Sequence, residues 1–267
     1  MNKKEIKKEY QKEKKTLKKT YKIERKAKKR ALKTELLSVK DSYIEKAAEL
    51  VRSRGKKAPI NPPKRALLEE IGNAVSHGLG ALFAVLALIL MLWGSDSRQD
   101  YFGAIVYFIG LFVMFTMSCL YHALPYGSCV KRIFRRFDYS CIYLLIGATF
   151  APILLSYVGG VFGIVFFLVQ WAVIITGITF IGVFGPTRLK WLHTPLYIIL
   201  GWCGVMFLPR MIENDLLFAF YILGGGVIYS LGLIPFTLKT KVAHFVWHFF
   251  VLAGAVVQWL GVYFYIY

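Results

Sequence analysis

The chain has 267 residues, of which 57% are hydrophobic and 16% aromatic, yet its formal net charge is +19. Residues 1–65 contain 24 of the 34 Lys and Arg and 8 of the 15 Asp and Glu, a local charge of +16, whereas the remaining 202 residues carry 10 basic and 7 acidic side chains, or +3. A segment with so few charged side chains cannot cover a water-exposed surface, which excludes a soluble enzyme, a disordered scaffold and a β-barrel porin. The composition predicts an all-α, polytopic membrane protein with a basic tail.

The N-terminal tail is predicted to form a long, largely solvated helix. Residues 3–54 contain no Gly or Pro and are dense in Lys and Glu, and their apolar residues fall near a 3.6-residue period. Gly55 and the prolines at 59, 62 and 63 end this helix. We therefore expect a basic helical cytoplasmic tail over 1–58, a Pro-containing linker over 59–68 and a transmembrane domain over 69–267.

The transmembrane domain is predicted to contain seven spans, because a helix needs about 20 apolar residues to cross the hydrocarbon core. The short separators carry turn residues, such as Pro125-Tyr126-Gly127, Gly159-Gly160 and Gly185-Pro186. Lys and Arg are in excess in every second loop, which predicts a seven-helix bundle in the cell membrane with the N-terminus inside and the C-terminus outside. The expected spans are 72–93, 101–122, 137–157, 160–183, 191–209, 216–236 and 243–265.

Three histidines and one aspartate fall at the predicted cytosolic end of this bundle. His122 ends the second span, Asp138 begins the third, and His244 and His248 lie in the first two turns of the seventh. The i, i+4 spacing of His244 and His248 places both imidazoles on one helix face. Three or four nitrogen and oxygen ligands are the set that Zn²⁺ takes in proteins, so the pattern indicates a metal site. An interfacial Asp138 beside basic residues, and simple packing of the histidine pair, are the alternatives.

Two further histidines, His77 and His193, fall on the same predicted side. His77 lies about one turn inside the first span, and we expect a hydrogen-bonded histidine near a helix end. His193 precedes Pro195 at the start of the fifth span, where an interfacial position is expected.

Six motifs follow one another along the membrane portion: EEIGNAVSHGLGA (69–81), SCLYHALP (118–125), RRFDYSCIYLLIGATFAP (135–152), GWCGV (201–205), GGGVIYSLG (224–232) and HFVWHFFVLAGAVVQW (244–259). In this order they resemble the bacterial hemolysin III family, which belongs to the progestin and adiponectin receptor family and has alkaline ceramidases as distant relatives. The resemblance covers about 69–265 and leaves out the tail. Tyr139 stands where the family pattern has a His, and Ala148 to Pro152 departs from the usual Gly-Thr-Tyr-Thr-Pro.

This resemblance implies a zinc ion near the cytosolic face, held by His122, His244 and His248. It implies that Asp138 holds the metal or its water, and that Ser118, one turn before the first ligand, belongs to the site. Glu69, Asn73, Ser76 and His77 correspond to the first motif of the family.

Two functions fit these residues. One is a zinc-dependent hydrolase of lipid amide or ester bonds, in which Asp138 takes a proton from water and Ser118 stabilises the developing oxyanion. The other is a non-catalytic, lipid-responsive sensor or modulator that holds a structural zinc ion and binds a fatty acid or an acyl-amide lipid. A pore-forming cytolysin is disfavoured, because the spans contain no second ring of charges to line a conduit.

The positive charge of the tail indicates the kind of partner that it binds. Each basic residue near an anionic bilayer surface contributes about 1 kcal/mol of attraction, so we expect the tail to bind anionic lipids. Nucleic acid is disfavoured as a partner, because the tail has no nucleic-acid-binding fold signature.

Overall fold

The computed structural model describes residues 3–53, 62–238 and 240–267. The chain divides into two compact units, one ending at Asn61 and the other beginning at Pro62. The described residues of the first unit form one helix, α1 (Lys3–Ser53), which confirms the long helix predicted for the tail. The predicted linker at 59–68 lies partly outside the described residues, and residues 62–66 have no regular secondary structure.

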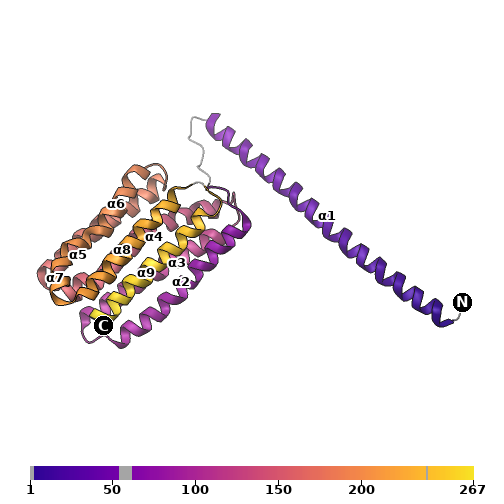
Figure 1. Ribbon diagram of the computed structural model, residues 1–267. Coiled ribbons are helices and arrows are strands. Elements are labelled where there is room, and N and C mark those ends of the chain that lie inside the picture. Colours follow the sequence, from indigo (N-terminus) through magenta and orange to yellow (C-terminus); the bar gives the residue numbers. More distant parts are fainter. Residues whose placement is uncertain (1–2, 54–61, 239) are drawn as a thin grey trace. The chain divides into compact units, whose positions relative to one another are not determined.

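Within the described residues of the second unit, seven segments are long and apolar enough to cross a membrane, which confirms the predicted number (Figure 1). The orientation of the bundle in the membrane stays a prediction. In chain order the segments are α2 (Leu67–Trp93); α3 (Arg98–Ala123); α4 (Cys129–Pro152) with a π-helical turn (Ile153–Val158); α5 (Gly160–Phe184); α6 (Lys190–Trp202) with a 3₁₀ turn (Cys203–Phe207) and α7 (Leu208–Asn214); α8 (Leu216–Thr237); and α9 (Ala243–Ile266).

Two spans begin more than one helical turn earlier than the sequence predicts. α2 starts at Leu67 rather than 72, and α4 starts at Cys129 rather than 137. The added turns contain charged residues, so they lie outside the apolar runs that define the predicted spans. Glu70 and Lys131 lie in these turns and pair with each other at 3.1 Å, so their charges are compensated inside the helical segments.

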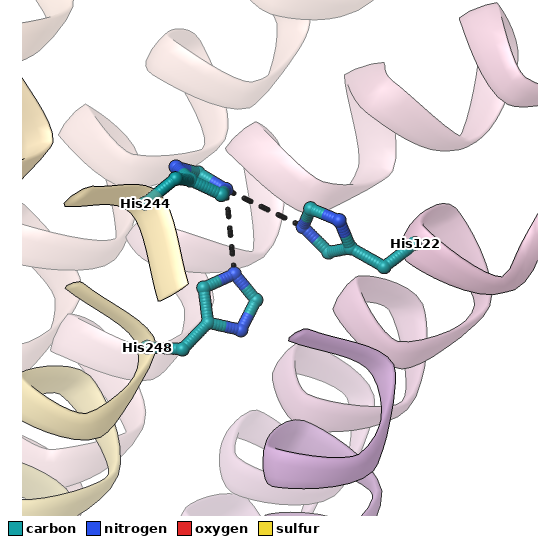
Figure 2. A group of neighbouring side chains, drawn as sticks. All are labelled: His122, His244 and His248. Carbon is teal, nitrogen blue, oxygen red and sulfur yellow. Dashed lines mark hydrogen bonds between the residues drawn. The ribbon is translucent and has the colours of Figure 1, made fainter. Parts of the chain in front are cut away.

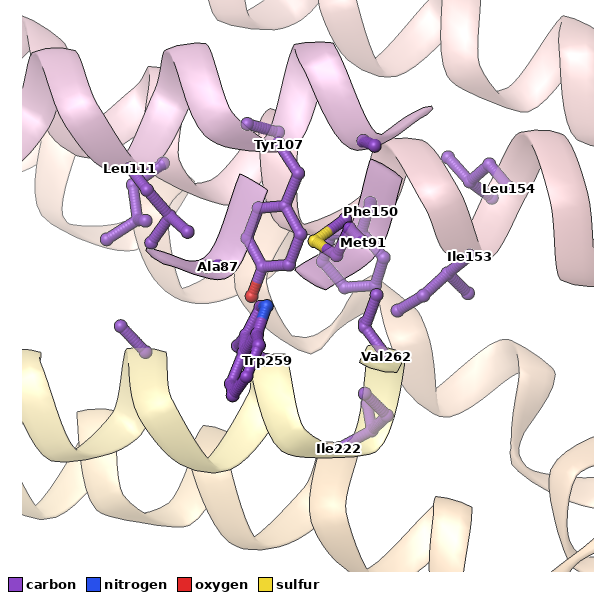
Figure 3. Close-up of a cluster of buried hydrophobic side chains, with 14 of the residues drawn as sticks. Ala87, Met91, Tyr107, Leu111, Phe150, Ile153, Leu154, Ile222, Trp259 and Val262 are labelled. Atoms are coloured by element: carbon purple, nitrogen blue, oxygen red, sulfur yellow. The ribbon is translucent and has the colours of Figure 1, made fainter. Parts of the chain in front are cut away.

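α4 is the central helix of the bundle. It packs against α3, α5, α6 and α9. In the most apolar 18-residue stretch of its span 67% is buried, whereas in the corresponding stretch of α5 only 22% is buried. The main core forms where side chains of α2, α3, α4, α8 and α9 meet, with Tyr107, Phe150 and Trp259 among its large members (Figure 3). A Cβ at Gly110 of α3 would lie 2.1 Å from the Cβ of Ala148, so a small residue is needed for this approach to α4.

The helices reverse direction at tight turns that the sequence supplies. Gly159 and Gly160 adopt φ values of 63° and 61°, which permits the sharp turn from the third span into α5. At the start of α3, Ser97 and Asp100 form a reciprocal capping box. The Ser128 hydroxyl accepts a 3.1 Å hydrogen bond from the backbone N–H of Lys131 and so begins α4.

These reversals bring the starts of α2, α4, α6 and α9 and the ends of α3, α5 and α8 to one end of the bundle (Figure 1). We call this the basic end, because the first turns of α4 contain Lys131, Arg132, Arg135 and Arg136, and because Arg188 and Lys190 lie just before and at the start of α6. At the opposite end, the connections and the adjoining helix turns contain acidic and basic residues in mixture. By the distribution of Lys and Arg, the basic end is expected to face the cytosol.

Candidate metal site

Three histidines converge at the basic end of the bundle. His122 comes from the last turn of α3, and His244 and His248 come from the first two turns of α9. The Nε2 atom of His244 lies 3.4 Å from the Nε2 of His122 and 3.3 Å from the Nε2 of His248 (Figure 2). One ligand atom from each residue lies within 4.8 Å of the others, so the three could hold a metal ion. The predicted meeting of these side chains is therefore confirmed.

The Glu70 carboxylate determines which nitrogen of His122 carries a proton. The Nδ1 of His122 lies 2.5 Å from Oε2 of Glu70 and 3.3 Å from Nδ2 of Asn73. Because an ionised carboxylate only accepts hydrogen bonds, the Nδ1 of His122 is the donor. In the neutral imidazole this leaves the lone pair on Nε2, which faces the other two histidines. A carboxylate behind a histidine is the usual second partner at metal sites.

Ser76 has the same relation to His248. The Ser76 hydroxyl donates to the backbone carbonyl of Asn73 at 3.0 Å, so its oxygen can accept a hydrogen bond from Nδ1 of His248 at 3.5 Å. The Nε2 of His248 then also carries a lone pair that can bind a metal ion. Both inferred tautomers thus direct Nε2 atoms toward a shared point, as metal binding requires.

Lys131 compensates the buried charge of Glu70. Its ammonium group donates to Oε1 of Glu70 at 3.1 Å and to the backbone carbonyl of Leu124 at 2.9 Å. The Lys131 side chain is only 1% exposed. A buried charge is costly without a partner, so Lys131 and Glu70 hold each other in place behind His122.

Asp138 and Ser118 lie beside this histidine cluster. The Ser118 hydroxyl hydrogen-bonds the Asp138 carboxylate, which also interacts electrostatically with His122 and with Arg65 and Arg135. Among the described residues, the group that could hold a metal contains the three histidines and not Asp138. Direct metal binding by Asp138 therefore stays a prediction, whereas its position next to the site is observed.

The remaining residues of the first motif divide between the site and its surroundings. His77 is buried ten residues into α2, and its ring stacks on His248 with ring centroids 3.8 Å apart. It therefore packs against the site, whereas a hydrogen-bonded histidine near a helix end was expected. Glu69 instead pairs with Arg65, with 3.6 Å between Oε1 of Glu69 and Nε of Arg65. The nearest carboxylate of the motif is thus Glu70, which the sequence interpretation had not selected.

A mostly apolar cavity leads away from the histidines into the bundle. His244, His248, Asp138 and Ser118 line one part of it, and Gln258 lines another. Gln258 lies ten residues beyond His248 on α9, which corresponds to about 15 Å along the helix axis. Its apolar wall includes Met114, Ile142, Leu145, Ile146, Phe150, Leu233 and Val251.

His193 lines the same cavity from α6. We expected an interfacial side chain, but His193 is 2% exposed. Its Nδ1 lies 3.0 Å from the hydroxyl of Tyr143, and its Nε2 has no hydrogen-bond partner within the described part of the chain. Burial follows from the packing of α6 against α4, a tertiary contact that is not visible in the local sequence.

The family relationship follows from comparison with known proteins. A family model described as haemolysin-III related matches residues 65–259. The chain belongs to the haemolysin III family. Hemolysin-3 of Bacillus cereus is 34% identical over 203 residues, covering 74% of this chain and 92% of that protein. The hemolysin-3 homolog of Bacillus subtilis is 30% identical over 74% of this chain and 94% of that protein.

A human relative is more distant. The monocyte to macrophage differentiation factor of Homo sapiens is 25% identical over 79% of this chain and 90% of its own length. The haemolysin III match contains all three histidines of the cluster, together with Glu70 and Lys131, and begins after α1. This haemolysin III protein is therefore a multi-pass membrane protein whose basic helix α1 lies outside the matched region.

Sequence reasoning missed Glu70 and Lys131. Glu69 and Glu70 are adjacent in the first turn of α2, and both lie within about 70° of Asn73 around a helix, so spacing alone does not separate them. Lys131 precedes the apolar run predicted at 137–157 and so falls in a predicted loop. Its i, i+3 relation to the capping Ser128 was the available signal that it belongs inside a helix.

Proposed function

We propose that this haemolysin III protein is a zinc-dependent hydrolase of lipid amide or ester bonds. The observation that carries the proposal is the convergence of three imidazole Nε2 atoms, two of which belong to His244 and His248, residues that line a mostly apolar cavity. Such a cavity suits an acyl chain, and the nitrogen donors suit Zn²⁺.

The donor set fits zinc on chemical grounds. Glu70 and Ser76 direct the lone pairs of His122 and His248 to the same point, and His244 completes a set of three neutral nitrogen ligands. Three protein ligands that leave an open position are typical of catalytic rather than closed structural zinc sites. When bound, zinc supplies a water molecule with a pKa near 7 and polarises a carbonyl group.

The protein's own residues then move the protons and position the substrate. Asp138 accepts a proton from the attacking water while the water oxygen bonds to the carbonyl carbon, and it returns that proton to the leaving amine or alcohol as the acyl bond breaks. Ser118 holds Asp138 in the resting site and supplies a hydroxyl donor for the developing oxyanion. The apolar wall holds the acyl chain and excludes bulk water.

The proposal is tested with purified, zinc-loaded protein and two probes, an N-acyl sphingosine and an acyl ester. Released fatty acid is measured by mass spectrometry for the wild type, for Asp138→Asn and for Asp96→Asn, an exposed loop control. A general acid–base residue contributes roughly 10²- to 10⁴-fold, so Asp138→Asn should lose at least a hundredfold in rate while keeping its zinc and its unfolding temperature. Absence of turnover by the zinc-loaded wild type on both probes would refute the hydrolase.

The position of the histidines also favours a second function, a lipid-responsive sensor with structural zinc. A metal at this site would join α3 to α9, and Glu70 extends the connection to α2. In that case chelation should lower the unfolding temperature strongly, fatty acid should raise it again, and no probe should be hydrolysed. Turnover that is lost in Asp138→Asn without a change in stability contradicts this second function.

A further inference from the structure

Helix α1 carries an apolar stripe with an 11-residue period. Tyr10, Tyr21, Leu32 and Tyr43 recur at intervals of eleven residues. A second row with the same interval lies four residues before each of them and continues to the end of the helix. Its members are Ile6, Leu17, Lys28, Val39 and Leu50, so Lys28 is the one charged residue in the two rows.

An 11-residue repeat keeps the stripe close to the axis direction of a single helix. Eleven residues make three turns of 3.67 residues, so on an ideal helix of 3.6 residues per turn the stripe shifts by about 20° per repeat. α1 is one continuous helix of 51 residues, or about 76 Å in length. The apolar stripe side chains that the structure describes are between 48% and 70% exposed. The stripe is therefore a long apolar line that turns by about 60° between Tyr10 and Tyr43, which suits a flat partner.

The charge of α1 is concentrated in its first part. Residues 3–33 contain 16 basic and 4 acidic side chains, a net +12, whereas residues 34–53 contain 3 basic and 4 acidic ones, a net −1. The partner should therefore be acidic at its surface and accept apolar side chains along its length. An anionic bilayer has both properties.

The covalent connection favours the membrane over other partners. α1 ends at Ser53 and the first span begins at Leu67, and the residues between them reach at most about 3.6 Å each. A second copy alongside would bring two segments of +12 together, and RNA would offer phosphates without an apolar layer. Lys28 can extend its ammonium group to the headgroups while its methylenes stay with the stripe.

We propose that α1 lies along the surface of an anionic bilayer with the Tyr10–Tyr43 stripe facing the acyl chains. This interaction goes beyond attraction by charge, because it depends on which face of the helix is apolar. The chain provides a matched control, since Ile23 and Leu37 are exposed apolar residues of α1 outside the stripe. Ile23 lies two residues from Tyr21, about 200° around the helix, and Leu37 lies five residues from Leu32, about 140° around it.

The test uses the full chain as a single copy in nanodiscs of phosphatidylglycerol or of phosphatidylcholine. Trypsin cleavage within α1 is followed by mass spectrometry for the wild type, Tyr21→Glu/Leu32→Glu and Ile23→Glu/Leu37→Glu. Both double variants change the net charge equally and keep every Lys and Arg. We expect wild-type cleavage to be at least roughly tenfold slower in phosphatidylglycerol, because basic residues and buried apolar side chains both stabilise binding.

The two double variants separate the proposal from its alternatives. The stripe variant should lose the protection, since each glutamate replaces a buried apolar contact, and the control variant should keep most of it. Equal loss in both variants would mean attraction by charge alone and would overturn the proposal. Discs assembled with two copies are compared with the single-copy discs. Protection that appears only with two copies, in either lipid, would make a second chain the partner and would also overturn the proposal. Neither outcome depends on zinc or on turnover at the histidine site.

Discussion

The two ends of the bundle use their polar side chains in different ways. At the end opposite the histidines, polar groups satisfy backbone atoms: Ser97 and Asp100 cap α3, and Arg210 donates to the backbone carbonyl of Val158 at 3.0 Å. At the basic end, buried side chains bind one another, as Glu70 does with His122 and Lys131. Backbone atoms are thus the partners of the capping groups and of Arg210, whereas ionisable side chains are the partners at the basic end.

This difference between the two ends indicates that the functional site lies at the basic end. A helix end needs only one or two hydrogen bonds to its free N–H groups, and a short polar side chain provides them. A buried network of Glu70, Lys131 and three histidines costs desolvation energy that the helix ends do not require. Its presence at one end is explained if a bound cation joins the network.

The largest expected effect is the loss of the metal from the basic end. His248→Ala removes one of three nitrogen ligands, so zinc content by elemental analysis should fall from about one ion per chain to near background. His193→Ala is the matched control, because His193 is equally buried and lines the same cavity but lies outside the cluster. Equal zinc content in His248→Ala and the wild type would refute the site.

The second effect concerns the residue behind His122. Glu70→Gln removes the charge that orients the imidazole, and zinc affinity measured by competition with a chelator should fall by about 10- to 100-fold. Glu69→Gln makes the same change one residue earlier, at a side chain that pairs with Arg65, and should leave the affinity within about twofold of wild type.

A double variant separates orientation of the ligand from simple stability. Glu70→Gln leaves Lys131 buried without its carboxylate, which should lower the free energy of unfolding. Glu70→Gln/Lys131→Met removes both charges, so stability should recover while the zinc affinity stays low. Recovery of zinc affinity together with stability would mean that Glu70 has only a structural role.

The sequence predicts the spans well because their signal is composition over 20 residues, which does not depend on tertiary contacts. It also predicts that His122, His244 and His248 share one end, since strict alternation of spans determines the end at which each residue lies. It does not identify Glu70 over Glu69, because that choice depends on the rotation of α2 against α3. His77 and His193 were misplaced for the same reason: stacking on His248 and packing of α6 on α4 are contacts between distant segments.

The smallest effect compares one helix cap from each end. Ser97→Ala removes a side chain that accepts from the backbone N–H of Asp100 at 3.1 Å, so the free energy of unfolding should fall by about 1 kcal/mol. Zinc affinity should not change, because this cap lies at the end opposite the histidines. Denaturant unfolding and chelator competition on the same samples measure the two quantities.

Ser128→Ala is the counterpart at the basic end. Its hydroxyl accepts from the backbone N–H of Lys131, so a similar loss of about 1 kcal/mol is expected in stability. Here the first turn of α4 also positions the Lys131 ammonium against Glu70. Fraying of that turn should therefore weaken zinc binding, although by less than Glu70→Gln, whose carboxylate contacts His122 directly. If Ser97→Ala weakened zinc binding as much as Ser128→Ala, the two ends would be coupled, and the separation of roles between them would be wrong.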